Sequence, residues 1–354
     1  MSQDIMVSFC ISSYKRKEMV EELVLHFLSS KNEKIEVVVV DDCSKDGTIE
    51  CLNLIRDKRL HVYEKEYQEG GSACWYDALE KGSGRWLFQI IDRDWIDITK
   101  IDTLINELQK LEEENVGFAV AGEKFSDSEE VKIYGAGFET LREFALRHSH
   151  PTGQIFRKED WDKIDNKKQY FYDEKYGIYP HGYLYAIMGN YKKGAYLLFD
   201  ICDKAHYNQR IIKTISTVYA SRSDKKEWFM PESRYRLLTL AAENIQLIDN
   251  KDFIKPIMLD RYIKFFYLVT NEWYHNCNNK ILKKRYHRED METNYISLLV
   301  NGFDYIALFR EYLEENKYEW ADEDFYRTLC ELDQKLIKWL LEWTEGIRKK
   351  GNDL

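Results

Sequence analysis

Two pairs of aspartates stand where two apolar segments end. Asp41 and Asp42 directly follow the run IEVVVV, and Asp92 and Asp94 follow the run WLFQII. Ligands of open α/β sheets bind at the carboxyl ends of the strands. Residues i and i+2 of an extended chain share a face, so Asp92 and Asp94 can converge on one hard cation, Mg²⁺ or Mn²⁺. The pattern favours an enzyme that binds a nucleotide. One acidic pair would contact the nucleotide itself, and the other would bind its diphosphate through a metal.

Each pair also has a purely structural interpretation, which the residues alone leave open. The segment Asp41–Thr48 has the composition of a turn that leads into a capped helix. Asp92 and Asp94 could be an exposed strand end at which Arg93 pairs with a neighbour.

The segments around these aspartates alternate between strand and helix patterns. Strands are predicted at residues 6–11, 35–40, 60–63, 86–91 and 116–121. Helices are predicted at residues 19–28, 48–55, 70–81 and 101–111, where apolar residues recur at helical spacing. Such alternation indicates an α/β fold, a mostly parallel sheet with helices on both faces. Beyond about residue 205 the pattern becomes helical, so we expect an α/β domain at 1–204 and a helical region at 205–354.

Composition excludes several classes of protein. The 354 residues carry a net charge of −10, which argues against a general nucleic-acid binder. The seven cysteines are odd in number and never spaced as CxxC, which fits a reducing cytosol. The first residues resemble a strand rather than a signal peptide, and no apolar run approaches the roughly 18 residues of a membrane span. We therefore expect a cytoplasmic protein.

Taken together, the segments resemble the inverting glycosyltransferases of family 2, which have the GT-A fold. MVSFCISSYKR is similar to the first strand and loop of that family, and VVVVDDCSKDGT to its second strand and acidic turn. Gly70–Gly84 is similar to the helix before the metal-binding strand, and IDRDW to the metal motif itself. The resemblance covers about residues 5–200 and is strongest over 5–100.

The resemblance implies roles for residues of the first two strands. Ser12 and Tyr14 would line the base and ribose of the donor nucleotide. Asp42 would hold the uracil-type edge of the base, and Asp41 would support the loop.

The resemblance also implies that Asp92 and Asp94 face the ribose and the metal bound to the diphosphate. Two positions depart from the family. Trp95 occupies the place of a further metal-binding aspartate, and Trp75-Tyr76 stands where the family tends to have Arg-Asn. Metal binding would therefore depend on Asp94 or be weakened.

Inverting transfer needs a base that removes the proton of the acceptor hydroxyl. Family members use a carboxylate after the metal motif, beyond a glycine segment that Pro151–Arg157 resembles. The candidates, in order of preference, are Asp173, His181 and Glu174. His181 is included because histidine is also a competent base near neutral pH. Each could instead be a surface carboxylate or a hydrogen-bonded loop histidine. His148 and His150 could add a metal nitrogen, although such pairs are more often loop residues.

The expected function is transfer of a sugar from a nucleotide-diphosphate donor to a hydroxyl of a glycan or lipid-linked acceptor. A metal would assist the transfer, which would invert the configuration of the sugar. The expected donor is above all a UDP-sugar. Family members of this kind build bacterial surface polysaccharides. Three alternatives stay open. The protein could be a catalytically silent GT-A module that binds sugar nucleotide or scaffolds an assembly. A dinucleotide-dependent enzyme is disfavoured because no GxGxxG follows the first strand, and a nucleotidyltransferase because its glycine-rich first loop is absent.

Residues 205–354 match no known motif. They could complete the fold and form a homodimer, supply a wall of the acceptor site, or dock as a peripheral element on the inner face of the membrane. Lys280–Arg288 and exposed aromatics such as Trp273 would assist docking. The acidic net charge favours packing or oligomerisation.

Overall fold

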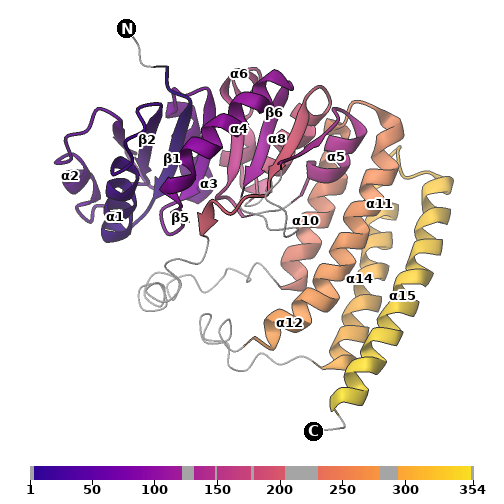
Figure 1. The fold of residues 1–354 in the computed structure, drawn as a ribbon. Helices are drawn as coiled ribbons and strands as arrows, with labels where there is room; N and C mark the ends of the chain where they lie inside the picture. Colours follow the sequence, from indigo (N-terminus) through magenta and orange to yellow (C-terminus); the bar gives the residue numbers. More distant parts are fainter. Residues whose placement is uncertain are drawn as a thin grey trace. The chain divides into compact units, whose positions relative to one another are not determined.

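The structure is a computed structural model that describes residues 4–121, 131–147, 150–176, 179–203, 230–279 and 294–351. The chain divides into two compact units, Met1–Asn208 and Gln209–Leu354, which we describe separately. The first unit contains strands and helices, and the described part of the second is helical (Figure 1).

An eight-stranded sheet forms the centre of the first unit, in the order β3-β2-β1-β4-β8-β6-β9-β7. The strands are β1 (Val7–Ser13), β2 (Ile35–Asp41), β3 (Leu60–Glu64), β4 (Trp86–Ile91), β6 (Val116–Ala121), β7 (Val131–Tyr134), β8 (Gln154–Arg157) and β9 (Lys193–Leu197). A separate two-stranded ladder joins β5 (Trp95–Ile96) to β10 (Cys202–Asp203). The predicted strands at 86–91 and 116–121 have the predicted limits.

The sheet is mixed in direction. β3, β2, β1 and β4 run parallel to one another, and β6 runs parallel to β9. β8 lies antiparallel between β4 and β6, and β7 lies antiparallel at the edge. The prediction of an α/β fold is confirmed, and the mostly parallel order holds for the half that carries the aspartates. Insertion of β8 brings the chain just before Gln154 next to the end of β4.

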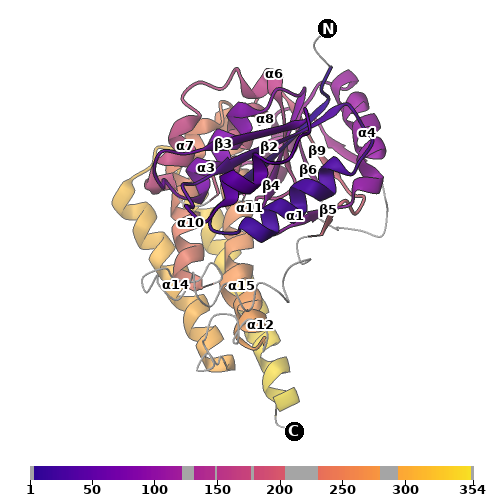
Figure 2. The same cartoon turned by 90° about the vertical axis from the view of Figure 1, so that its left-hand side faces the viewer.

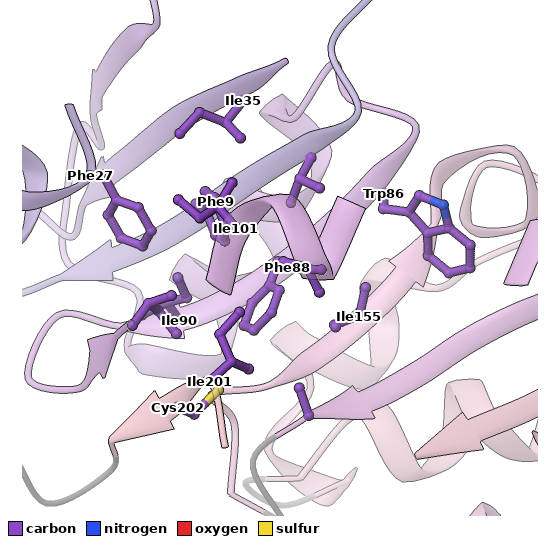
Figure 3. Packing of buried hydrophobic residues seen from close by; sticks show 14 of the residues in the cluster. Phe9, Phe27, Ile35, Trp86, Phe88, Ile90, Ile101, Ile155, Ile201 and Cys202 are labelled. Carbon is purple, nitrogen blue, oxygen red and sulfur yellow. The ribbon is translucent and has the colours of Figure 1, made fainter. Parts of the chain in front are cut away.

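One face of the sheet is covered by α1 (Lys17–Leu28) and α4 (Ile101–Glu113), whose apolar stripes belong to the main core cluster (Figure 2). Phe9 of β1 stacks on Phe27 of α1 with ring centroids 4.4 Å apart and contacts Phe88 of β4 at 5.5 Å (Figure 3). Fully burying one such side chain contributes roughly 1.5–3 kcal/mol. This cluster fixes β1 against β4 and hence the level at which both strands end.

The opposite face of the sheet carries α3 (Gly71–Lys81), which follows Gly70 and ends at Gly82 as predicted. The Cys74 thiol of α3 donates to the Val40 carbonyl oxygen of β2 at 3.2 Å. The remaining helices of this unit are short: α2 (Thr48–Leu52), α5 (Phe138–Phe144), α6 (Lys158–Trp161), α7 (Lys168–Tyr172) and α8 (His181–Gly189).

The second unit contains α10 (Pro231–Asn244), α11 (Lys251–Tyr267), α12 (Trp273–Cys277), α14 (Tyr295–Asn316) and α15 (Glu323–Gly351). The prediction of a helical C-terminal region is confirmed. Buried Asp333 of α15 ties three of these helices together, because it accepts hydrogen bonds from Tyr262 of α11 at 2.6 Å and from Arg310 of α14. Among the helices described, none is both long and apolar enough to cross a membrane. The basic segment Lys280–Arg288 lies outside the described residues.

Candidate active site

The ends of β1, β2 and β4 are level with one another. Ser12 of β1 pairs in register with Val40 of β2 on one side and with Ile91 of β4 on the other. Asp41 and Asp92 are the next residues along their strands, so the two acidic pairs begin on either side of β1. The sequence predicted acidic residues at this edge of the sheet, and the register of the three strands brings them there.

Asp41 holds the loop after β2. Its buried carboxylate accepts hydrogen bonds from the Ser44 amide at 2.7 Å and the Ser44 hydroxyl at 2.5 Å. The same hydroxyl accepts a bond of 2.8 Å from the Lys15 amide in the loop after β1. Burial raises the pKa of Asp41 from its usual value, and the bonds from Ser44 oppose that shift. Asp41 therefore joins two loops through Ser44, and its contacts are those of a supporting residue.

These two loops contain three non-glycine residues with positive φ, Lys15 at 52°, Cys43 at 60° and Lys45 at 54°. L-residues with side chains adopt this region rarely, and each instance costs of the order of 1 kcal/mol. Such strain concentrates where a structure holds backbone in place for a ligand. Its position beside the acidic edge agrees with a binding site there.

Asp42 serves the start of α3. Its Oδ1 accepts from the Glu69 amide and its Oδ2 from the Gly70 amide, both at 2.9 Å. A carboxylate offers about four lone-pair positions, so these two bonds leave acceptor capacity for the N–H of a base. The turn interpretation of this segment also holds at α2, where Asp46 Oδ1 accepts from the Thr48 amide at 3.1 Å, while Asp42 serves the segment before α3.

The loop between β3 and α3, which supplies those two amides, is held by Lys65. Its Nζ pairs with Asp77 and, at 2.6 Å, with Glu69, and it donates to the Tyr172 hydroxyl at 3.2 Å. Burial by itself lowers the pKa of Lys65, but the bonds to Asp77 and Glu69 raise it above the usual value. The lysine is therefore a fixed cation in a structural network.

Tyr14 links the first loop to the same segment, since its hydroxyl donates to Gln68 Oε1 at 3.0 Å. Its ring is half-buried, as expected of a residue that lines a pocket. Ser12 is 7% exposed at the end of β1, and the hydroxyl oxygen of neighbouring Ser13 is buried without a hydrogen-bond partner in the described part of the chain. Buried polar atoms of this kind usually mark a missing partner.

Asp92 is fully buried and pairs with Arg16, whose Nη1 lies 2.6 Å from Asp92 Oδ1. Its Oδ2 is buried and accepts no hydrogen bond from any described residue. Arg93, which the structural interpretation paired with a neighbour, forms no ion pair with another described residue, and Asp92 is buried rather than exposed. The counter-ion of Asp92 therefore comes from the loop after β1.

Asp94 is also fully buried, and a hydroxyl donates to it. Its Oδ2 accepts a hydrogen bond from Thr152 Oγ1 and lies 3.5 Å from His150 Nδ1. His148, the other histidine considered for a metal, lies outside the described residues. The segment just before β8 thus faces the acidic pair after β4.

Trp95, in place of a further aspartate, has a structural role. Its ring stacks on His26 of α1 with centroids 3.9 Å apart, and its backbone belongs to the β5–β10 ladder. The indole packs against α1, so nothing at this position replaces the missing carboxylate.

The described residues contain no group of three or more His, Cys, Asp or Glu side chains arranged to hold a metal ion. Mg²⁺, however, is commonly bound by one or two carboxylates, with substrate phosphates and waters completing its shell. The buried Oδ2 of Asp92 without a partner, close along the chain to Asp94, fits that kind of site. The two aspartates are compatible with a cation that arrives with a diphosphate.

The three candidate bases are placed differently from one another. Asp173 is exposed and bonds only locally, accepting from the Lys175 amide at 3.0 Å with Lys175 Nζ 3.1 Å away, and these contacts lower its pKa. Glu174 is exposed on the following turn. His181 is the first residue of α8 rather than part of a loop, and it is fully buried with the Tyr179 and Tyr185 rings about 6 Å away. An acceptor could reach either carboxylate directly, whereas the imidazole has no exposed surface.

Two residues of this site were not singled out from the sequence, Arg16 and Thr152. Arg16 stands at the end of a motif that did attract notice, but nothing in its spacing indicates a partner 76 positions away. Thr152 lies in a short Pro-Thr-Gly stretch typical of any turn. Only the paired strands bring these side chains to the aspartates.

Comparison with known proteins identifies the fold. Residues 8–166 match the model of glycosyl transferase family 2. The crystal structure of S. aureus TarS 1-349 in complex with UDP has 16% sequence identity and a TM-score of 0.50, over 89% of this chain and 93% of that one. At this identity the likeness concerns the fold alone.

Two relatives match about a third of the chain. TuaG of Bacillus subtilis (strain 168), named for teichuronic acid biosynthesis, is 32% identical over 119 residues, 33% of this chain and 46% of its own. WfaP of Escherichia coli, named as a UDP-Glc:alpha-D-GlcNAc-diphosphoundecaprenol beta-1,3-glucosyltransferase, is 30% identical over 114 residues, 32% of this chain and 44% of its own. The chain thus spans less than half the length of these relatives. The fold and the acidic edge are those of a GT-A module, and the match to glycosyltransferase family 2 over residues 8–166 confirms, for that part of the chain, the resemblance seen in the sequence.

Proposed function

We propose that the protein is an inverting glycosyltransferase that moves a sugar from a UDP-sugar to a hydroxyl group. The observation that carries this proposal is the joint placement of Asp42, Asp92 and Asp94 after β2 and β4, the two strands that flank β1. One carboxylate with spare acceptor capacity and two buried carboxylates suit a base edge and a diphosphate-bound cation, respectively.

On the donor side, Asp42 would accept the N–H of uracil while its bonds to the Glu69 and Gly70 amides keep it in place. Ser12 and Tyr14 would line the base and ribose, and Asp92 would face the ribose. Asp94 would hold Mn²⁺ or Mg²⁺, with Asp92 as a second ligand. The cation, when bound, would stabilise the charge that develops on the leaving diphosphate.

In the transfer step, the acceptor oxygen forms a bond to C1 of the sugar while the bond from C1 to the diphosphate oxygen breaks. Attack from the opposite side inverts the configuration at C1. The base takes the acceptor proton, and we keep Asp173 as the first candidate, with His181 and Glu174 as alternatives. The exposure of Asp173 favours it, while its lowered pKa makes it a weak base until an acceptor displaces Lys175.

For the acceptor, we propose a hydroxyl of a glycan or of a lipid-linked sugar in polysaccharide assembly. Support comes from the name of WfaP, whose acceptor is a diphosphoundecaprenol-linked GlcNAc. Residues 1–204 would bind donor and acceptor in the cytoplasm. Residues 205–354 would form a homodimer contact, or hold the enzyme at the inner face of the membrane.

The first experiment is thermal unfolding with UDP, GDP, CDP, dTDP and NAD, each with and without Mn²⁺. A ligand at about 100 times its Kd stabilises by roughly 2.7 kcal/mol. We expect a UDP shift that requires Mn²⁺. A UDP shift indifferent to Mn²⁺ would remove the metal from the proposal, and a shift with NAD alone would overturn it.

A second function is favoured by Trp95, which stands in place of one metal ligand of the family and stacks on His26. The protein could bind sugar nucleotide without transferring the sugar and act as a silent module. Incubation with UDP-sugars and lipid-linked or glycan acceptors, with UDP release as the readout, separates the two. Release that depends on acceptor excludes the silent module.

A further inference from the structure

Thr152, in the segment that leads into β8, lies at the centre of a contact that neither the family match nor the relatives assign. Its side chain is fully buried. Its hydroxyl accepts a hydrogen bond of 2.9 Å from the Ile91 amide, the last residue of β4, and donates its own proton to Asp94 Oδ2. One hydroxyl thus ties the end of the strand to the carboxylate that follows it.

The direction of these bonds is fixed. A threonine hydroxyl has a single proton to donate, and the Ile91 amide can only donate. The hydroxyl must therefore accept from Ile91 and give its proton to Asp94. Valine, which replaces the hydroxyl by a methyl group, would leave the Ile91 amide and Asp94 Oδ2 without these partners.

The backbone on either side holds Thr152 in place. The Gly153 amide donates to the Gln89 carbonyl of β4 at 3.1 Å, and the Gly153 carbonyl accepts from the Ala121 amide of β6 at 2.8 Å. Gln154 Nε2 donates to the His150 carbonyl at 2.7 Å on the other side. Thr152 is therefore anchored to two strands of the sheet and cannot turn its hydroxyl to solvent.

The two aspartates after β4 are held in different ways. Arg16 contributes a positive charge to Asp92, whereas Thr152 contributes a neutral donor to Asp94. A hydroxyl that donates to a carboxylate fixes the orientation of that carboxylate. Hydrogen-bond partners of this kind orient metal-binding carboxylates, and their loss typically weakens metal affinity or activity by 10–100-fold.

We propose that Thr152 is a positioning residue that orients the Asp94 carboxylate for the cation of a nucleoside diphosphate complex. This inference rests on the proposed function, because it assigns Asp94 to that cation. It predicts that the hydroxyl, and not the shape of the side chain, is needed for tight binding.

The test compares T152V, which replaces the hydroxyl by a methyl group, with T152S, which keeps it. The matched control is T140V. Thr140 is equally buried, and its hydroxyl accepts from the Gly194 amide and donates to the Tyr134 carbonyl, both at 3.0 Å. It therefore has the same bonding pattern without an aspartate partner.

Mn²⁺ affinity is measured on the full chain by electron paramagnetic resonance, with saturating UDP, together with kcat and KM for the UDP-sugar. We expect T152V to weaken Mn²⁺ binding by about 10–100-fold, and T152S to restore it to within about threefold of the wild type. T140V should lose stability as T152V does, yet keep the affinity of the wild type.

Three results would overturn the inference. If T152V and T140V bind Mn²⁺ equally well, Thr152 is only structural, and the proposed function stands. If the wild type binds no nucleoside diphosphate with or without Mn²⁺, the proposed function fails and the inference fails with it. Wild-type binding of UDP that ignores Mn²⁺ also overturns the role at the cation and leaves the donor site intact.

Discussion

Asp92 and Asp94 are two residues apart, yet their surroundings differ in charge. Arg16 lies within ion-pair distance of Asp92, so its positive charge balances the negative charge of that carboxylate. Asp94 is bonded to a hydroxyl and lies at 3.5 Å from an imidazole that is charged only when protonated. A divalent cation relieves the cost of burying carboxylates close together. The proposed function makes Asp94 the principal metal ligand.

We expect Asp94→Asn to lower the rate of sugar transfer by about 10²-fold or more, the effect typical of removing one preorganised electrostatic group. Asp160→Asn is the matched control. Asp160 lies on α6, outside the acidic edge, is also fully buried and pairs with Lys192 at 3.0 Å. Initial rates of UDP release measure the effect. Equal rates for Asp94→Asn and the wild type would contradict the role of Asp94.

Cys43, directly after Asp42, allows binding of the nucleotide base to be probed without measuring sugar transfer. We expect saturating UDP to slow alkylation of Cys43 by N-ethylmaleimide by at least about tenfold, since a ligand at 100 times its Kd leaves about 1% of sites free. Cys330 of α15, similarly half-buried, should be unaffected. Mass spectrometry of the labelled peptides gives both rates, and equal slowing of the two cysteines would refute a local effect.

Two further thiols supply a pH control for that experiment. Burial raises the pKa of Cys10 and of Cys74 well above the usual value, so the reactive thiolate is scarce at pH 8. Raising the pH from 7 to 9 should speed labelling of exposed thiols and leave these two unlabelled as long as the protein stays folded. Labelling of Cys10 in the folded protein would show that the β1 core opens.

At the scale of elements, the antiparallel insertion of β8 is what completes the edge. A turn at 151–153 passes between the ends of β4 and β6, and Gly153 has φ of +96° there. A Cβ atom on Gly153 would lie inside contact distance of the Ala121 carbonyl oxygen. Glycine is therefore required both for its conformation and for the close approach of the two backbones.

We expect Gly153→Ala to destabilise the first unit by roughly 1–3 kcal/mol, through strain at a positive φ and displacement of the turn. Gly71→Ala on α3 is the control, because a Cβ there meets only the Trp75 ring, at an ordinary 3.9 Å. Urea unfolding followed by circular dichroism measures both. A Gly153→Ala variant as stable as the control would show that the turn is not constrained as the structure has it.

At the scale of the whole molecule, the chain divides into an α/β unit with the acidic edge and a helical unit with its own buried network around Asp333. All the candidate donor-binding residues belong to the first unit. A ligand stabilises only the part of a protein that binds it. If the units unfold separately, the nucleotide should therefore affect only one of them.

We expect calorimetry of the full chain to show two transitions, of which saturating UDP with Mn²⁺ raises one by about 5–10 °C. NAD at the same concentration serves as the control and should leave both unchanged. Transitions that move together with UDP would mean that the two units unfold as one cooperative body, and the proposed division near residue 205 would then need revision.

Much of the fold was predictable because the relevant signals are local. The β-branched run before Asp41 and the helical spacing of α4 specify a strand and a helix within a few residues of their observed limits. Residues 122–200 were harder, since short strands such as β8 have no periodicity that separates them from loops. The structural alternative placed His181 in a loop, and it begins a buried helix instead.

The sequence by itself determined the alternation of strands and helices, the acidic residues at the strand ends and the likeness to family 2, because each of these is written in contiguous residues. Only the tertiary structure decided which groups hold the aspartates. Arg16 reaches Asp92 and Thr152 reaches Asp94 because β1 and the turn before β8 flank β4, and strand order is a long-range property. Asp42 likewise accepts from the Glu69 and Gly70 amides just before α3, because β2 and β3 are neighbours in the sheet.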